Sequence, residues 1–270
     1  MIYLKTIISA ENEIKYIKLQ LRESDGYVDK LIVCEFDHTH IGTERDFIFQ
    51  RYLEDNTFSG DEKERIIYIQ GHVGKKIKRT TDNATLMHRN ERLFRGYFAR
   101  HCSLQPNDVI ISVDADEIIF RRCYDDILSL FEDKKANPII QLQLYQFFYK
   151  PTYLWTNLII TAPTVCRVKA NRFKRYPAQW RQEGEVLDMM VGCHFSWCLT
   201  IDEMVYKLRT YAHAADYGYL ADRAILEDAI RNKNYPFDES VDFQIREVNH
   251  KDNPEYYPDT YDEKEFACLL

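Results

Sequence analysis

Glycine and proline are scarce in this chain, with 9 and 8 residues among 270. Because low-complexity linkers and disordered tails are usually rich in small, polar or cyclic residues, this scarcity argues against both. No repeat with a solenoid period is present either. The 45% hydrophobic and 29% charged residues are ordinary for a globular protein. We therefore expect a single domain over residues 1–270, in which residues 249–270 form a tail that wraps the surface.

Membrane-spanning and secretory segments are also missing. No apolar run reaches the roughly 18 residues that a spanning helix needs. Met1 leads directly into residues 2–8, which are typical of a strand and lack the charged and long apolar regions of a signal peptide. Seven cysteines occur without a CxxC pair, and Cys34 and Cys123 lie in or beside apolar segments. This pattern favours reduced core thiols, so we expect a soluble, cytoplasmic protein without a transmembrane segment.

An excess of positive charge is absent as well. The formal net charge is −7, whereas proteins that bind nucleic acid generally present a basic surface to the phosphates. A short basic run at residues 75–79 is better explained as a solvated loop. We therefore expect no nucleic-acid partner.

Apolar periodicity predicts strands that alternate with helices in the first half of the chain, and a mixture of both in the second half. Strands are expected at residues 2–8, 28–34, 65–70, 109–113 and 139–149, with a further strand or hairpin at 155–168. Helices are expected near residues 14–21 and at 44–55, 85–101, 125–131, 201–214 and 220–231. Such alternation indicates an α/β fold with a mostly parallel central sheet flanked by helices.

The most informative run is Val113-Asp114-Ala115-Asp116-Glu117. It stands at the end of an apolar strand, and in open α/β sheets ligands bind at the carboxyl ends of the strands. Carboxylates this close repel one another unless a cation or several hydrogen-bond donors offset their charge. A divalent ion that bridges to a diphosphate would do so. Asp-x-Asp in this position is the arrangement of nucleotide-sugar glycosyltransferases.

A set of further segments is more specific than the Asp-x-Asp run alone. The set comprises Ala10-Glu11-Asn12-Glu13, Val28-Asp29-Lys30-Leu31-Ile32-Val33-Cys34-Glu35, Thr39-His40-Ile41-Gly42, Arg89-Asn90, Gly192-Cys193-His194-Phe195-Ser196-Trp197 and Lys207-Leu208-Arg209. Over about residues 5–217, the chain resembles glycosyltransferase family 17 in these segments. The best known member of that family adds the bisecting N-acetylglucosamine to N-glycans.

The resemblance implies a GT-A-type nucleotide-diphospho-sugar transferase fold, a divalent metal (Mn²⁺ or Mg²⁺) and inversion at the anomeric carbon. On this basis we expect a metal-dependent glycosyltransferase that moves a sugar from a UDP-sugar to a glycan or glycoconjugate acceptor. N-acetylglucosamine is the first candidate for the transferred sugar.

On the same resemblance, the predicted metal site consists of Asp114, Asp116 and His194. Hard cations prefer oxygen ligands, so we expect Asp116 to bind the metal directly. Asp114 is expected to lie nearer the ribose or to reach the metal through water. His194 is either a ligand of the metal or diphosphate or a satisfied core histidine, and His213 is its rival as ligand. Glu117 is either a partner of this site or an acid at a helix start.

The residues predicted to bind the donor are Asn12, Glu13, Glu35, Arg89, Arg95 and Asp114. Asn12, Glu13 and Glu35 follow the first two strands, where this fold holds the nucleoside, and a carboxylate can accept hydrogen bonds from ribose or base. Asn12 is equally suited to be a helix N-cap. The guanidinium groups suit phosphate oxygens, with surface ion pairs as the alternative.

An inverting transfer needs a carboxylate that deprotonates the acceptor hydroxyl. The candidates are Glu183, Glu185, Asp188 and Asp216. Members of the family tend to carry an acid two residues after the position of His213. This chain has Ala215 there, and Asp216 comes one residue later. The choice of base therefore stays open.

Two other functions are compatible with parts of the pattern. A non-catalytic relative that only binds nucleotide-sugars or glycans would explain the altered position of the base. A phosphotransferase of the haloacid-dehalogenase type also uses Asp-x-Asp after a strand. Those enzymes, however, place the motif on their first strand and follow it two residues later with Thr or Val, where this chain has Ile118.

Overall fold

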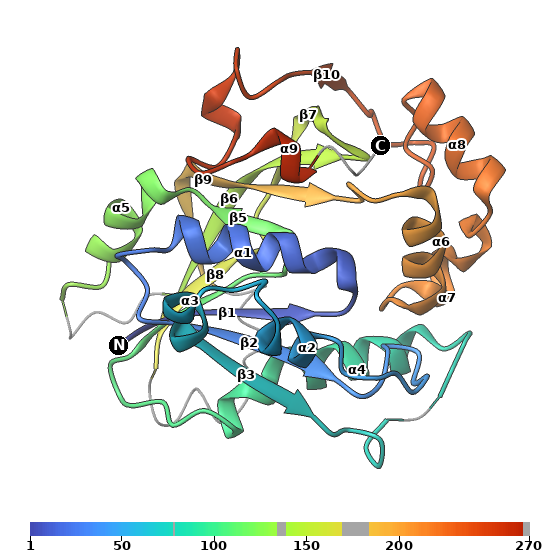
Figure 1. Cartoon of the computed structure of the whole chain (residues 1–270). Coiled ribbons are helices and arrows are strands. Elements are labelled where there is room, and N and C mark those ends of the chain that lie inside the picture. The colour runs from blue at the N-terminus through green and yellow to red at the C-terminus, as the bar shows by residue number, and fades with distance from the viewer. Residues whose placement is uncertain (78, 134–138, 169–183, 267–270) are drawn as a thin grey trace.

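A ten-stranded sheet forms the centre of the protein in the computed structural model, which describes residues 1–77, 79–133, 139–168 and 184–266 (Figure 1). Its strands are β1 (Ile2–Ile8), β2 (Lys30–Phe36), β3 (Ile66–Gly71), β4 (Val109–Ser112), β5 (Glu117–Ile119), β6 (Ile139–Phe148), β7 (Lys150–Ile160), β8 (Thr164–Arg167), β9 (Glu185–Ser196) and β10 (Ile245–Glu247). The main path is β10-β7-β6-β8-β4-β1-β2-β3, and β9 pairs with both β6 and β5.

Most strands of this sheet run in one direction. β4, β1, β2 and β3 are parallel neighbours, and β9 is parallel to β6. β5, β7 and β8 run the opposite way. The expected α/β fold with a mostly parallel sheet flanked by helices is thus confirmed. Residues 155–168, predicted as a strand or hairpin, contribute the end of β7 and all of β8, which joins β4 to β6.

The helices are α1 (Ile14–Glu23), α2 (Phe49–Glu54), α3 (Gly60–Arg65), α4 (Ala84–Gly96), α5 (Tyr124–Ser129), α6 (Ile201–Thr210), α7 (Ala214–Tyr217), α8 (Arg223–Asn232) and α9 (Glu263–Phe266). Short 3₁₀ turns are η1 (Glu11–Glu13), η2 (Tyr97–Arg100), η3 (Arg121–Cys123), η5 (Gly218–Leu220) and η6 (Pro254–Tyr256). The expected helices at 44–55, 201–214 and 220–231 are present but shorter. The sequence pattern missed β5, β9, β10, α3 and α9. An internal glycine such as Gly192 of β9 counts against a strand.

Different helices cover the two faces of the parallel strands. Leu31 and Val33 of β2 pack in one apolar cluster with α1. Ile32 and Cys34 point the other way and pack in a second cluster with Phe94 of α4. This alternation is the two-residue period of a strand. It places α1 and α4 on opposite faces of the sheet (Figure 1).

The carboxyl ends of the strands point toward the C-terminal helices. In Figure 1 the arrowheads of β1 and β9 are directed to the right, where α6, α7 and α8 lie. These helices and the β6–β7 hairpin contribute to a third apolar cluster. That cluster includes Trp155, Trp197 and Leu208. Since ligands of open α/β sheets bind at this edge, we expect the functional site in the loops between the sheet and these helices.

The tail inserts aromatic side chains into the main core. Tyr257, Tyr261 and Phe266 are buried, and the rings of Tyr261 and Phe266 lie 5.9 and 5.6 Å from that of Phe195 on β9. The backbone nitrogen and hydroxyl of Thr260 each donate to Oε1 of Glu23 at 2.6 Å. Residues 257–266 therefore pack against both β9 and α1.

The burial of the cysteines and the length of the helices can be compared with what the composition predicted. Cys34 and Cys123 are buried in the core, as predicted, and burial raises the pKa of the Cys34 thiol to about 12. No disulfide joins cysteines within the described residues. Among the helices of those same ranges, none is both long enough and apolar enough to cross a membrane.

Candidate active site

Two motifs that are far apart in the sequence meet at the carboxyl end of β4. Asp114 and Asp116 lie in the turn between β4 and β5, and His194 on β9 is the antiparallel partner of Glu117 on β5. The backbone nitrogen of Phe195 donates to the carbonyl of Asp116 at 2.9 Å. The β5–β9 pairing therefore holds the Asp-x-Asp turn against the Gly-Cys-His-Phe-Ser-Trp motif.

Gln20 and Glu117 fix the shape of the Asp-x-Asp turn. The side-chain amide of Gln20, on α1, donates to the carbonyls of Asp114 and Ala115 at 3.0 Å each and to that of Glu117 at 3.2 Å. The carboxylate of Glu117 accepts from the backbone nitrogen of Asp114 at 2.6 Å. Of the two roles predicted for Glu117, the structure thus favours a partner of the site, because the residue lies on β5 and not at a helix start.

Asp114 forms a two-pronged ion pair with Arg95 of α4. The two Asp114 oxygens accept from the Arg95 guanidinium at 2.6 and 3.0 Å. Arg95 also donates to Glu91 at 3.0 Å. Although burial alone would lower it, the neighbouring carboxylates hold the pKa of Arg95 above its usual value. Because both Asp114 oxygens already accept from the Arg95 guanidinium, the geometry favours an indirect role for Asp114 toward a metal.

Asp116 lies between two cationic partners. Its carboxylate oxygens are 3.4 Å from Nε2 of His194 and 3.7 Å from Nζ of Lys207 on α6. The Asp116 side chain is only 15% exposed. Burial opposes the charged form, but His194 and Lys207 outweigh it and lower the pKa of Asp116. Burial would likewise lower the pKa of His194, yet the Asp116 charge raises it above the usual value.

The tautomer of His194 follows from its second partner. Nδ1 of His194 lies 2.9 Å from Oε1 of Gln146 on β6, and the Gln146 amide nitrogen donates to the carbonyl of Phe147 at 3.2 Å. Because an amide oxygen only accepts, Nδ1 carries a proton and donates it to Gln146. Nε2 therefore faces Asp116 and can lose its own proton to become a metal ligand.

This donor set fits a divalent cation. Two ligands about 2.1 Å from one ion lie roughly 3.0–3.4 Å apart, and the Asp116–His194 separation is 3.4 Å. A carboxylate with a histidine that is oriented by an outer hydrogen bond is a common pair of ligands. Asp116 and His194 could therefore hold the ion, with Asp114 reaching it through water.

The first strand brings Asn12 and Glu13 to the same edge. Glu13 accepts hydrogen bonds from the backbone nitrogens of Ser9 and Ala10 at 2.5 and 3.1 Å. Burial raises the pKa of Glu13 to about 7, and the charge of Asp116 adds to the effect. The N-cap of η1 is Ala10 and not Asn12. Oδ1 of Asn12 is buried and has no hydrogen-bond partner within the described ranges, which leaves it available to a ligand.

Glu35 is not brought to this site. It is fully buried, and its oxygens accept from the backbone nitrogens of Ile48 and Phe49 at 2.8 and 3.0 Å and from the Tyr68 hydroxyl at 2.6 Å. Arg45 lies 3.4 Å away. These contacts show that Glu35 stabilises the start of α2, which leaves no exposed oxygen for a ribose or base.

The substitution Glu35→Gln tests that structural role. The amide places a donor where two backbone N–H groups need an acceptor, so we expect a loss of on the order of 3 kcal/mol in the free energy of unfolding. Denaturant titration measures this loss, and Glu239→Gln, at an exposed acid, is the matched control. Unchanged stability together with weaker donor binding would instead support the nucleoside role.

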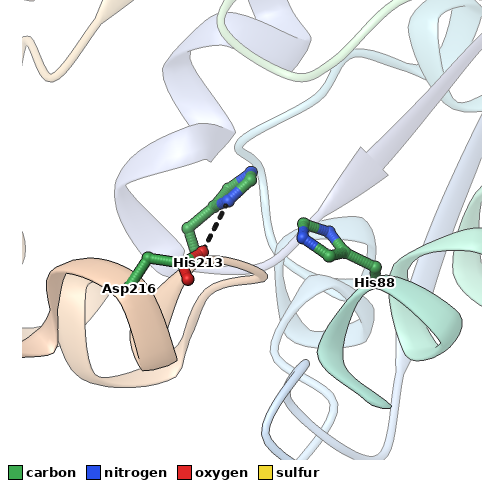
Figure 2. A group of neighbouring side chains, drawn as sticks. All are labelled: His88, His213 and Asp216. Carbon is green, nitrogen blue, oxygen red and sulfur yellow. Dashed lines mark hydrogen bonds and ion pairs between the residues drawn. The ribbon is translucent and has the colours of Figure 1, made fainter. Parts of the chain in front are cut away.

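The other predicted residues are spread over several elements. Arg89 is exposed on α4, and Glu183 lies outside the described residues. Glu185 and Asp188 lie near the start of β9; at ~3.3 Å per residue, Asp188 is about 20 Å along the strand from His194. Asp216 lies on α7, with Oδ2 3.3 Å from Nδ1 of His213 (Figure 2). Glu185 and Asp188 are therefore not brought to the Asp116–His194 pair.

Three residues of the site were not predicted as members of it. Lys207 lies in the Lys-Leu-Arg segment of the family pattern, so its position in that segment was a usable signal. Gln146 interrupts the apolar alternation of β6 and is nearly fully buried, which is unusual for a glutamine. Gln20 lies on the buried face of α1. In each case the partner depends on long-range packing.

Comparison with known proteins gives one match over most of the chain. The family model described as Glycosyltransferase family 17 matches residues 2–232. No curated protein matches the chain.

The similar solved structures are remote. One is a Bacillus anthracis protein described as a glucose-1-phosphate thymidylyltransferase in complex with a sucrose, with 9% identity, a TM-score of 0.37 and coverage of 71% of this chain and 88% of that one. Another is a mannose-6-phosphate isomerase from Helicobacter pylori, with 11% identity, a TM-score of 0.31 and coverage of 64% of this chain and 63% of that one. Likenesses at these scores carry no argument, so the GT-A type of the fold stays a prediction.

Proposed function

This chain belongs to glycosyltransferase family 17 and is a glycosyltransferase, and we propose that it transfers a sugar with inversion from a UDP-sugar to a glycan or glycoconjugate, in a metal-dependent reaction on a GT-A-type fold. The observation that carries this proposal is the buried Asp116 carboxylate between His194 and Lys207, beside the Arg95–Asp114 ion pair. UDP-N-acetylglucosamine is the first donor to test.

Asp116 and His194 are the residues that would hold the cation, Mn²⁺ or Mg²⁺. When bound there, such an ion neutralises charge on the departing diphosphate. Gln146 keeps Nε2 of His194 directed at Asp116 through its contact with Nδ1. Lys207 lies on the other side of Asp116 and would contact a diphosphate oxygen as a point charge.

Donor binding is assigned to the residues around that pair. Arg95 holds Asp114 in a fixed orientation, in which its partly exposed carboxylate can orient a ribose. Asn12 offers a buried amide oxygen that has no partner within the described residues, and such an atom suits an N–H or O–H group of a nucleoside. Positioning of the donor in this way supplies much of the rate enhancement expected of a transferase.

Asp216 is the acid that we retain as candidate base. α7, which carries it, follows α6 and Lys207 directly in the chain, and His213 lies 3.3 Å from its carboxylate. In this role Asp216 would accept the proton of the acceptor hydroxyl while the donor is held by the residues above.

A thermal-shift panel with UDP-, GDP- and CMP-sugars, with and without Mn²⁺, tests the proposed donor and metal. A ligand at about 100 times its Kd adds about 2.7 kcal/mol to the stability, which corresponds to roughly 5–11 °C in Tm. We expect such a shift only with a UDP-sugar and Mn²⁺ together. Because the proton on Nε2 of His194 competes with the ion, the shift should be larger at pH 8 than at pH 6.

Measured transfer then separates an enzyme from a binding relative. The donor that gives the shift is offered with a mixture of glycan acceptors, and release of UDP above its hydrolysis rate is recorded. A shift without transfer to any acceptor would favour the non-catalytic relative. No shift with any nucleotide-sugar in the presence of Mn²⁺ would defeat the donor assignment.

A further inference from the structure

A second group of metal-ligand side chains lies between α4 and α7. It consists of His88, His213 and Asp216, none of which belongs to the Asp114–Asp116–His194 set (Figure 2). One ligand atom from each of the three lies within 4.8 Å of the other two. Figure 2 shows the two imidazole rings close together, with the Asp216 carboxylate beside His213.

One separation in this group matches that between two ligands of a bound ion, and the third side chain lies close to both. Nδ1 of His213 and Oδ2 of Asp216 are 3.3 Å apart, within the roughly 3.0–3.4 Å between two ligands that share one ion. The ring centres of His88 and His213 are 4.8 Å apart, with the planes at 72°. We propose that His88, His213 and Asp216 bind a divalent transition-metal ion of the Zn²⁺ class.

The ligand types point to that class and not to Mg²⁺. Two imidazoles with one carboxylate suit Zn²⁺, Co²⁺ and Fe²⁺, whereas Mg²⁺ prefers oxygen ligands alone. All three side chains are partly exposed, at 38%, 45% and 41%. Three protein ligands with access to solvent are typical of an open site, in which water or a small ligand completes the coordination.

Helix geometry and outer contacts support the arrangement. His213 precedes α7 and Asp216 lies three residues later, a spacing that puts both side chains on one face of the helix. Nδ1 of His88 lies 3.6 Å from Glu91, and Glu91 is 2.9 Å from Arg95. An outer carboxylate that orients a histidine is a recurrent feature of metal sites.

The proposed site lies between two parts of the chain that are far apart in the sequence. α4 belongs to the first half of the chain, and α7 follows the strand and helix that carry His194 and Lys207. An ion bound to all three side chains would therefore cross-link these two parts of the molecule. It would also engage the Asp216 carboxylate, and a carboxylate that ligates a cation is a weaker base.

Cobalt titration of the full chain tests the site independently of sugar transfer. Co²⁺ gives visible absorption when it binds histidine and carboxylate in a site of low symmetry. The titration uses Asp116→Asn protein, so that the other predicted metal site does not contribute. We expect one Co²⁺ to bind, with a spectrum that Zn²⁺ abolishes by competition. His88→Gln, His213→Gln and Asp216→Asn should each weaken binding at least about tenfold.

Matched substitutions decide between a metal site and an ordinary surface contact. His72→Gln, at a histidine that is 70% exposed and outside the group, should leave the Co²⁺ affinity unchanged. Circular dichroism checks that each variant is folded, and a Zn²⁺-dependent rise in Tm that His88→Gln removes gives a second readout. The proposal is overturned if Co²⁺ does not bind, or if binding survives His88→Gln or His213→Gln at full affinity. Neither result depends on whether a UDP-sugar binds.

Discussion

Asp116→Asn is expected to lower kcat by at least about a thousandfold while the protein stays folded. A thousandfold loss corresponds to about 4 kcal/mol of transition-state stabilisation, which is in the range expected when a metal that neutralises a leaving group is lost. The amide removes the negative charge of the carboxylate, whose Oδ1 lies 3.4 Å from Nε2 of His194 and whose Oδ2 lies 3.7 Å from Nζ of Lys207. The side chain keeps its size, so the packing around it is little changed.

Steady-state transfer and calorimetric Mn²⁺ binding measure this effect in parallel. Asp61→Asn, which makes the same chemical change at an exposed acid in the first turn of α3, should match the wild-type protein in both assays. Loss of Mn²⁺ binding together with loss of turnover supports Asp116 as ligand. Full turnover of the Asp116→Asn variant would defeat the assignment of the site.

Gly192→Ala is expected to cost on the order of 3 kcal/mol or more in stability, or about 6–12 °C in Tm. A Cβ atom at this position would lie 2.1 Å from the carbonyl oxygen of Ile118 and 2.8 Å from Cδ2 of Leu144. The Leu144 side chain can rotate, but the Ile118 carbonyl belongs to the backbone of β5. β5 and β9 would therefore have to separate where they pair, which also moves His194 away from Asp116.

The control for this substitution is Gly60→Ala. No atom lies within 4 Å of a Cβ built on Gly60, and its φ is not in the positive range. Because Gly60 opens α3, alanine there should change the stability by less than about 1 kcal/mol. Thermal unfolding of both variants makes the comparison. Equal melting temperatures would show that the two strands can shift apart without strain.

The apolar strands and the polar residues that follow them could be predicted from the sequence. Residues 109–113 form an apolar run broken only by Ser112, and β4 occupies Val109–Ser112 with the two aspartates shortly after it. A polar residue directly after such a strand must lie at the carboxyl edge of the sheet, because the sheet fixes where the strand ends. The same reasoning located β1 and the edge at which Asn12 and Glu13 lie.

Contacts between distant segments could not be predicted in this way. A pattern of apolar residues indicates that Glu35 ends a strand, but not that Ile48, Phe49 and Tyr68 satisfy its carboxylate. Similarly, nothing local to Lys207 indicates that α6 places it 3.7 Å from Asp116. The hydrogen-bond partners of buried polar groups depend on tertiary packing, and the apolar periodicity of one segment carries no information about that packing.

The packing of the tail has a consequence for the order of folding during synthesis. Tyr261 and Phe266 stack against Phe195, and the Phe195 nitrogen donates to the carbonyl of Asp116. The ribosome makes residues 257–266 after every other described element. The N-terminal sheet and its helices therefore emerge before the aromatic rings that pack against Phe195. We therefore expect a chain that ends before residue 257 to form its strands but to lack the aromatic packing behind Phe195.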